Sequence, residues 1–389
     1  MLSFIVFSML LNSMSVIILQ LSQNQQHSYT GLGMLEFFKD IPIALVSIFM
    51  VDYIKKRSYY SSLSIALIIC TLCSFTIPFV SEFWFLKIWF ILIGISFSIG
   101  KICVFSIIKN ISDNEKDFSK TMSRTEAAFM LGVFIVNIEF AIILNSDYKD
   151  YWKFGFWLVG IISSWAAFQF YRIDKQNVFE IGKSQSKEVI DFRILFDYKS
   201  ILFFTIVVII VFTEQIFNSW LPTFYKHTLK ADSFFALQSS AFLALFSFIG
   251  RLLASKAVVK FSPMKIFFFC LISGIILTSS AYIIGQDTDV KVKILMFLFP
   301  MVGIFTAPLY PMLNSKYLSK FSERRVGKIV SIIILFTSLG GSIGSMSTAY
   351  IFQKNLGNYY LLFATIPLIL ILIFSTFFSI KEKISEYIK

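Results

Sequence analysis

Residues 172–193 read RIDKQNVFEIGKSQSKEVIDFR, a polar stretch of mixed charge between two long apolar regions. Each region contains six segments that are apolar over the ~20 residues that a helix needs to cross a hydrocarbon core of ~30 Å. We therefore predict an all-α membrane protein of twelve transmembrane helices in two pseudo-symmetric six-helix halves. The predicted spans are residues 3–21, 33–54, 60–80, 84–108, 122–145, 153–173, 200–222, 235–257, 265–285, 294–315, 327–351 and 359–380.

The polar stretch also sets the predicted domain boundaries. Residues 1–173 form the N-terminal half, residues 174–199 a cytoplasmic linker and residues 200–389 the C-terminal half. Spans and loops use nearly all of the 389 residues, so no separate soluble domain is expected. Residues 1–20 lack the charged start and the small-residue cleavage site of a signal peptide, which favours a first transmembrane helix.

The composition agrees with a membrane protein. Hydrophobic residues make up 57% of the chain and charged residues 15%, whereas soluble domains carry about 25% charged residues. The net charge of +12 does not indicate a nucleic-acid partner, because Lys and Arg collect in cytoplasmic loops. The predicted spans leave 23 Lys and Arg residues on one side and 8 on the other. We therefore expect a monomer in a lipid bilayer, with both termini in the cytoplasm and a bacterial inner membrane as its location.

The motifs of enzymes and metal proteins are missing from the sequence. The four cysteines lie inside predicted spans and the two histidines in loops, so we expect no metal site and no cofactor. No G-x-x-x-x-G-K-[ST] motif occurs, which argues against ATP hydrolysis, and no catalytic constellation is visible. Twelve spans without a soluble domain favour a transporter over an enzyme.

The loop after the second span carries a basic cluster beside an acidic residue. Its sequence, IFMVDYIKKR over residues 48–57, resembles the G-x-x-x-D-R-x-G-R-R signature of the major facilitator superfamily in Asp52, Lys56 and Arg57. Both glycines and the first Arg of that signature are absent. The resemblance implies that these three residues form a cytoplasmic latch between the halves; a plain positive loop is the alternative.

Motifs in the second half extend the resemblance over the whole chain. FIGR at residues 248–251 resembles the helix 8 pattern of the superfamily, and EQIFNSWLP at 214–222 with PLYP at 308–311 resembles its fucose-permease-like branch. The resemblance implies transport by rocking of two halves around a central site. GGSIGS at residues 340–345 is a small-residue patch that permits close helix contact.

Ionisable side chains inside the spans are the main candidates for function. Inserting one into the middle of a membrane costs ~2.5–3.5 kcal/mol of free energy, so such a side chain is usually paired with an opposite charge or faces a water-filled cavity. Glu36, Lys39 and Asp40 share one helix face, where Lys39 can neutralise a carboxylate. Lys101 and Glu126 lie at similar depth on consecutive helices and are close enough to pair. A structural ion pair and a switch operated by substrate or proton are both open for each couple.

Glu214 has no evident partner in the sequence. A carboxyl group held out of water can bind and release a proton near neutral pH, so Glu214 is the first candidate for proton coupling, followed by Asp40 and Glu126. Arg251 is interpreted either as a ligand for an anionic substrate or as a latch to a neighbouring helix end. The polar side chains expected to add hydrogen bonds in the cavity are Asn12, Gln215, Asn218, Tyr310 and Asn314.

These observations predict a secondary active transporter that moves a small polar metabolite together with protons. The fucose-permease-like resemblance favours a sugar as the substrate. The intramembrane cations Lys39, Lys101 and Arg251 favour an organic acid or an amino acid. Efflux or antiport of a small molecule and a non-transporting membrane sensor are the alternatives.

Overall fold

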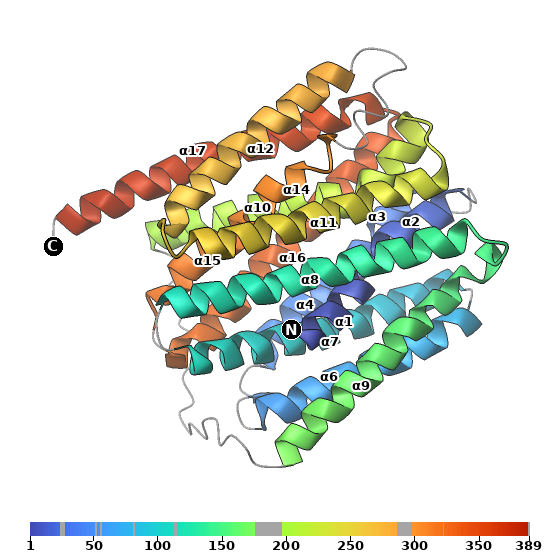
Figure 1. Cartoon of the computed structure of the whole chain (residues 1–389), viewed down its shortest axis with the longest axis horizontal. Coiled ribbons are helices and arrows are strands. Elements are labelled where there is room, and N and C mark those ends of the chain that lie inside the picture. The colour runs from blue at the N-terminus through green and yellow to red at the C-terminus, as the bar shows by residue number, and fades with distance from the viewer. Residues whose placement is uncertain are drawn as a thin grey trace.

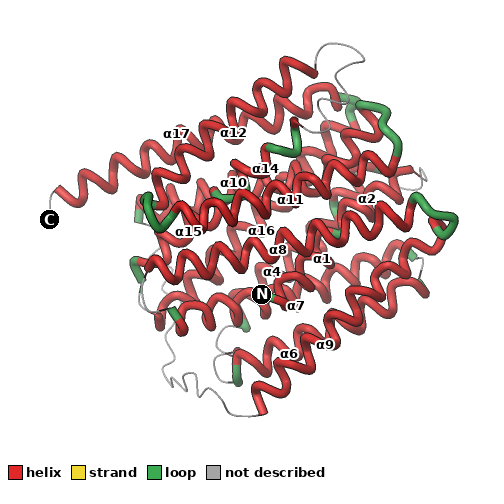
Figure 2. Tube along the Cα trace, in the orientation of Figure 1, coloured by secondary structure: helices red, strands yellow, loops and turns green. Residues whose placement is uncertain are grey.

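The computed structural model describes residues 1–23, 28–50, 53–54, 57–80, 82–112, 115–175, 197–285, 298–321 and 323–387. The regular structure within these ranges is helical, and no strand occurs among them (Figure 2). Ten helical segments in the described part of the chain are long and apolar enough to cross a membrane. These findings confirm the predicted all-α membrane class.

The helices follow the order of the predicted spans. Those before the linker are α1 (Leu2–Asn12), α2 (Met14–Gln23), α3 (Tyr29–Gly33), α4 (Leu35–Phe49), α6 (Tyr59–Thr76), α7 (Phe83–Ile111), α8 (Glu115–Leu144) and α9 (Phe156–Lys175). Those after it are α10 (Tyr198–Thr223), α11 (Ser233–Ala257), α12 (Pro263–Gly285), α14 (Val302–Thr306), α15 (Leu309–Ser319), α16 (Glu323–Gln353) and α17 (Tyr360–Tyr387).

Three of the twelve predicted spans are interrupted helices. The first, 3–21, is divided into α1 and α2, the second, 33–54, into α3 and α4, and the tenth, 294–315, into α14 and α15. The last two pairs are not among the ten long apolar segments. Counting each pair as one crossing gives the twelve expected spans. Most of the predicted linker, residues 176–196, lies outside the described residues.

Proline chemistry explains the break between α14 and α15. Pro308 precedes α15, and Pro311 lies in its first turn. Because Pro311 has no N–H, the carbonyl group of Ala307 loses the partner it would have in a continuous helix. The Nε atom of Arg251 donates a hydrogen bond to that carbonyl oxygen at 3.0 Å. The break therefore supplies a backbone ligand for an intramembrane cation.

The two halves meet along a seam through the middle of the bundle. Figure 1 shows α6 and α9 of the first half at the bottom and α12 and α17 of the second half at the top, with α8 and α11 side by side between them. Across the seam, α8 packs along α11, α4 and α3 pack against α16, and α2 packs against α10. Helices that face each other across this seam carry most of the intramembrane charges.

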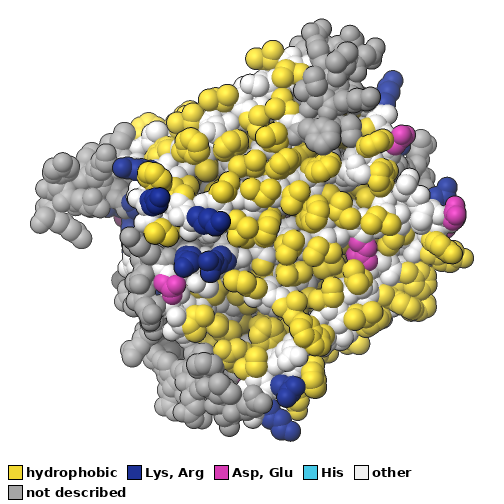
Figure 3. Space-filling view, viewed as in Figure 1, with side chains coloured by type: hydrophobic (Ala, Val, Ile, Leu, Met, Phe, Trp, Pro, Cys, Tyr) yellow, Lys and Arg dark blue, Asp and Glu magenta, His cyan; other side chains and the backbone are white. Residues whose placement is uncertain are grey.

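The surface matches a chain that lies in lipid. Figure 3 shows a broad hydrophobic face, with most of its visible Lys and Arg side chains toward the end where α11 and α17 finish. We call this the linker end, because α9 ends and α10 begins there, and we call the opposite end the far end. The predicted orientation puts the linker end in the cytoplasm.

The contact between α10 and α16 depends on glycine. We expect Gly340→Ala to destabilise the protein by about 1–3 kcal/mol, because its Cβ would overlap the backbone carbonyl of Val208 on α10. The thermal midpoint of the purified protein in detergent measures this effect. Gly274→Ala is the matched control, since its Cβ would meet no atom nearer than 3.7 Å. Equal midpoints for the two variants would contradict this close packing.

Candidate functional site

A cavity of about 130 Å³ lies between the two halves. It is lined by residues of α1, α4, α7 and α8 from the first half and of α10, α11, α15 and α16 from the second. Of the residues predicted for the site that the structure describes, all reach this lining except Glu36, Asn314 and Arg57. The polar residues that line it are Asn12, Lys39, Asp40, Lys101, Glu126, Glu214, Gln215, Asn218, Arg251, Tyr310, Thr337 and Ser338.

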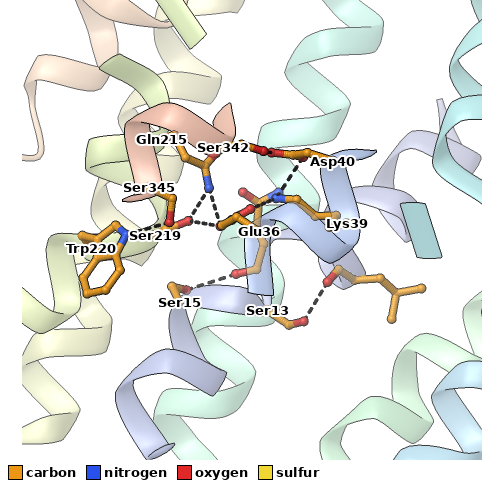
Figure 4. A network of polar contacts seen from close by, with 12 residues as sticks. Ser13, Ser15, Glu36, Lys39, Asp40, Gln215, Ser219, Trp220, Ser342 and Ser345 are labelled. Carbon is orange, nitrogen blue, oxygen red and sulfur yellow. Dashed lines mark hydrogen bonds and ion pairs between the residues drawn. The ribbon is translucent and has the colours of Figure 1, made fainter. Parts of the chain in front are cut away.

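Glu36 is the centre of a polar network on α4. Its carboxylate forms an ion pair with Lys39, as the i, i+3 spacing predicts. From the other half, the Nε2 atom of Gln215 and the hydroxyl of Ser219 donate to its Oε1 atom at 2.6 and 2.9 Å (Figure 4). The Glu36 side chain is fully buried. These bonds tie α4 to α10.

Asp40 extends the same network to α16. The hydroxyl of Ser342 donates to its Oδ2 atom at 2.9 Å, and its Oδ1 atom lies 3.8 Å from the Lys39 ammonium (Figure 4). A Cβ on Gly341 would lie 3.0 Å from that Oδ2 atom, so a small residue here lets the carboxylate approach α16. We call the following residues the α4 network: Glu36, Lys39, Asp40, Gln215, Ser219 and Ser342.

We expect the bond between Asp40 and Ser342 to stabilise the contact between the halves. Removing the hydroxyl with Ser342→Ala should lower the stability by about 1.5–3 kcal/mol, the usual range for a hydrogen bond to a charged group. A double-mutant cycle with Asp40→Asn, followed by thermal unfolding in detergent, isolates the pair. Strictly additive effects of the two substitutions would contradict a direct bond.

Arg251 forms a second network between the halves. Its Nη1 atom lies 3.1 Å from Oε2 of Glu126 and also donates to the Glu126 backbone oxygen at 2.9 Å. Its Nη2 atom lies 3.5 Å from Oε1 of Glu214. The hydroxyl of Ser123 donates to the Arg251 carbonyl oxygen at 3.1 Å. We call Arg251, Glu126 and Glu214 the Arg251 network.

This network corrects two expectations from the sequence. Glu126 forms its ion pair with Arg251 and not with Lys101, because α8 packs lengthwise along α11. Glu214 has a cationic partner after all, since Arg251 is 37 residues away in sequence but within reach on the neighbouring helix. The latch interpretation of Arg251 agrees with its bonds to α8 and to the break before α15.

Lys101 has a different environment from the other two cations of the cavity. Its Nζ atom donates to the Tyr310 hydroxyl at 3.2 Å, which links α7 to α15. The same atom lies 5.1–5.7 Å from the ring centres of Phe97, Phe105 and Tyr310. Within the described part of the chain, no carboxylate lies at ion-pair distance from it.

The remaining predicted residues have varied surroundings. The amide of Asn12 donates to the Ser8 carbonyl on its own helix at 3.0 Å. Asn218 lines the cavity and makes no hydrogen bond to any described residue. Asn314 is buried, and its Oδ1 atom has no hydrogen-bond partner among the described groups.

The proposed latch is only partly visible. Asp52 and Lys56 lie outside the described residues. Arg57 is exposed, and its guanidinium bonds to Tyr53 and Ser61, which both belong to the first half. The described part of the latch therefore makes no bond across the seam.

Contacts on both sides of the cavity join the halves, and the sequence did not reveal them. At the far end, the Tyr29 ring packs against Trp220 and Phe352, and Ser22 lies 3.4 Å from the His227 ring nitrogen. Toward the linker end, the Ser47 hydroxyl donates to the Ser331 carbonyl oxygen at 3.1 Å. Serines and aromatic rings are too frequent in this chain to identify such partners. These contacts join the two halves on both sides of the cavity.

Comparison with known families decides the classification. The model of the Major Facilitator Superfamily matches residues 1–345. The chain belongs to this superfamily. As a superfamily member it is a multi-pass membrane transporter of small molecules and not an enzyme.

Solved structures of superfamily transporters share the fold over nearly the whole chain. The E. coli fucose:proton symporter FucP has a TM-score of 0.68 and 14% identity, with 97% of each chain covered. A D-xylose-proton symporter has a TM-score of 0.73 and 16% identity, covering 96% of this chain and 95% of its own. A bacterial homologue of ferroportin has a TM-score of 0.68 and 11% identity, covering 97% and 98%. A comparison with curated proteins finds no match.

Proposed function

We propose that this transporter moves a small polar metabolite together with protons by alternating access, as a monomer in a bacterial inner membrane. The observation that supports this proposal is the pair of charged networks that bridge the two halves around one cavity. Both networks contain carboxylates, which can take up protons, and cations, which can bind an anion. The predicted orientation, with both termini in the cytoplasm, belongs to the same proposal.

The free energy of these networks links the separation of the two halves to the binding of protons and solute. Separating the halves removes partners from buried charges, and breaking a buried ion pair costs about 3–5 kcal/mol. The cost falls when a proton neutralises a carboxylate or when the solute replaces a lost partner. Rocking of the halves is therefore coupled to proton and solute binding, as alternating access requires.

Glu214 is the carboxylate best suited to exchange a proton. Its contact with Arg251 is 3.5 Å, longer than the 2.7–2.9 Å of a strong charge-assisted hydrogen bond. Its side chain is 19% exposed and lines the cavity, whereas that of Glu126 is 8% exposed and has the shorter contact. Glu214 is therefore accessible to the solute, and its interaction with Arg251 is weaker than that of Glu126.

The likeness to known symporters supports the coupling. The names of the fucose and xylose transporters state that each moves its sugar with protons. The sequence identities are 14% and 16%, so these likenesses establish a shared fold, and the substrate of this transporter has to be tested by experiment.

Proton flux in liposomes tests the proposed function. The purified protein is reconstituted with a pH-sensitive dye inside, and pooled neutral sugars or pooled organic acids and amino acids are added outside. Symport predicts that a solute gradient carries protons inward with the solute. Protons moving outward would favour antiport. Absence of both proton and solute flux with every pool would overturn the proposal in favour of a sensor.

A further inference from the structure

We propose that Lys101 and the hydroxyl of Tyr310 form a subsite for a carboxylate group, so that the transported solute is a compact organic acid. This inference rests on the proposed function, because it assigns the solute class of the same cavity. It chooses between the sugar and the acid that the sequence leaves open. Lys101 is buried, with 8% of its surface exposed, and it lines the cavity.

The first argument is the charge pairing of the cavity cations. Lys39 is held by Glu36 and Asp40, and Arg251 by Glu126 and Glu214. Within the described ranges, Lys101 has no carboxylate within ion-pair distance, although it faces the same cavity. Glu126 and Glu214 act on the Lys101 ammonium only from beyond contact distance. A buried ammonium gains from a direct anionic partner, so an anion that enters the cavity can bind it without displacing an existing ion pair.

The second argument concerns the hydrogen-bonding capacity left at this position. Three aromatic rings surround the Lys101 ammonium and stabilise the cation, but they supply no negative charge. The Tyr310 hydroxyl has Lys101 and Asn314 as neighbouring hydrogen-bond partners. Because Lys101 donates to the Tyr310 oxygen, the phenolic O–H can itself donate to an acceptor such as a carboxylate. The ammonium also retains unused donors. Together the two groups can bind both oxygens of one carboxylate.

The third argument is the remainder of the cavity. Asn218 lines it and makes no hydrogen bond to the described residues, so its amide can bind a hydroxyl or amino group of the solute. The volume of about 130 Å³ has room for on the order of ten water-sized groups. A hydroxy acid or amino acid of a few carbons fits this volume and these donors.

Ligand binding in detergent tests the subsite. The thermal midpoint of the full-length protein is measured with lactate, glutamate and glucuronate, and with lactamide, glutamine and glucose as neutral counterparts, at constant ionic strength. We expect at least one acid to raise the midpoint, while its neutral counterpart leaves the midpoint unchanged. Lys101→Met should abolish the response to the acid. Tyr310→Phe, which keeps the ring, should weaken the apparent affinity about tenfold.

The controls separate this inference from the proposed function. An acid response that persists in Lys101→Met, or equal responses to acids and neutral counterparts in the unaltered protein, would overturn the subsite. The comparison in the unaltered protein decides the question even where Lys101→Met does not fold. Binding in detergent needs no gradient, so acid binding without any flux in liposomes would refute the transport proposal alone. Flux of neutral sugars without acid binding would refute the subsite alone.

Discussion

Replacing Glu214 with Gln is expected to abolish uphill solute uptake and to leave exchange of solute across the membrane intact. Gln keeps the size and a hydrogen-bonding oxygen for Arg251 but cannot carry a proton. Without that proton, the transporter cannot use an imposed pH gradient to drive the accumulation of solute. Counterflow needs only that the loaded transporter changes its conformation, so it should continue.

The experiment compares two assays in the same liposomes. Uptake driven by a pH gradient should fall to the level of protein-free liposomes, while labelled solute should still exchange against an internal pool. Glu139→Gln is the control, because Glu139 is likewise a carboxyl group within a long apolar helix, α8, but lies outside the cavity lining and both networks. Uphill uptake that survives in Glu214→Gln would remove Glu214 as the coupling residue.

The second large effect is expected from Arg251→Met. This side chain is 2% exposed and interacts with two carboxylates and two backbone oxygens. Met fills a similar volume but leaves Glu126 and Glu214 buried together without a cation. Removing one partner of a buried ion pair costs about 3–5 kcal/mol, so we expect a strongly lowered thermal midpoint and loss of transport.

A second substitution shows whether charge is the cause. Adding Glu126→Gln to Arg251→Met removes one of the two uncompensated carboxylates and should recover part of the thermal midpoint. The bond from Arg251 to the Ala307 carbonyl stays lost in both variants, so recovery should be incomplete. Equal midpoints for the single and double variants would show that packing, and not charge, makes Arg251 important.

The helices were predictable because lipid offers the backbone no hydrogen bonds. Every span must satisfy its own N–H and carbonyl groups, so long apolar segments become helices. The exceptions are local. The sequence placed one continuous span at 294–315, whereas Pro308 and Pro311 divide it into α14 and α15. This division leaves the Ala307 carbonyl without a partner in its own helix, and Arg251 donates to it. Arg251 is 56 residues away in sequence, so the sequence around Ala307 does not reveal this bond.

The charged side chains were predictable as a set, but only some of their partners were. Glu36 and Lys39 are three residues apart on one helix, so their pairing follows from helical geometry. Arg251 and Glu126 are 125 residues apart, and their pairing depends on how α8 packs along α11. Ser342 bonds to Asp40 over 302 residues, and its neighbours in sequence give no sign of that role.

The central claim is that the two networks hold the halves together and that their protonation lets one end of the seam open. Distances between spin labels test it most directly, in a variant without the four native cysteines. One pair, at exposed Met34 and Tyr350, reports on the far end, and another, at exposed Ile111 and Phe261, on the linker end. Lowering the pH from 8 to 5 should add a longer distance at one end while the other stays short. Distances that do not change with pH, or that lengthen at both ends together, would contradict the account.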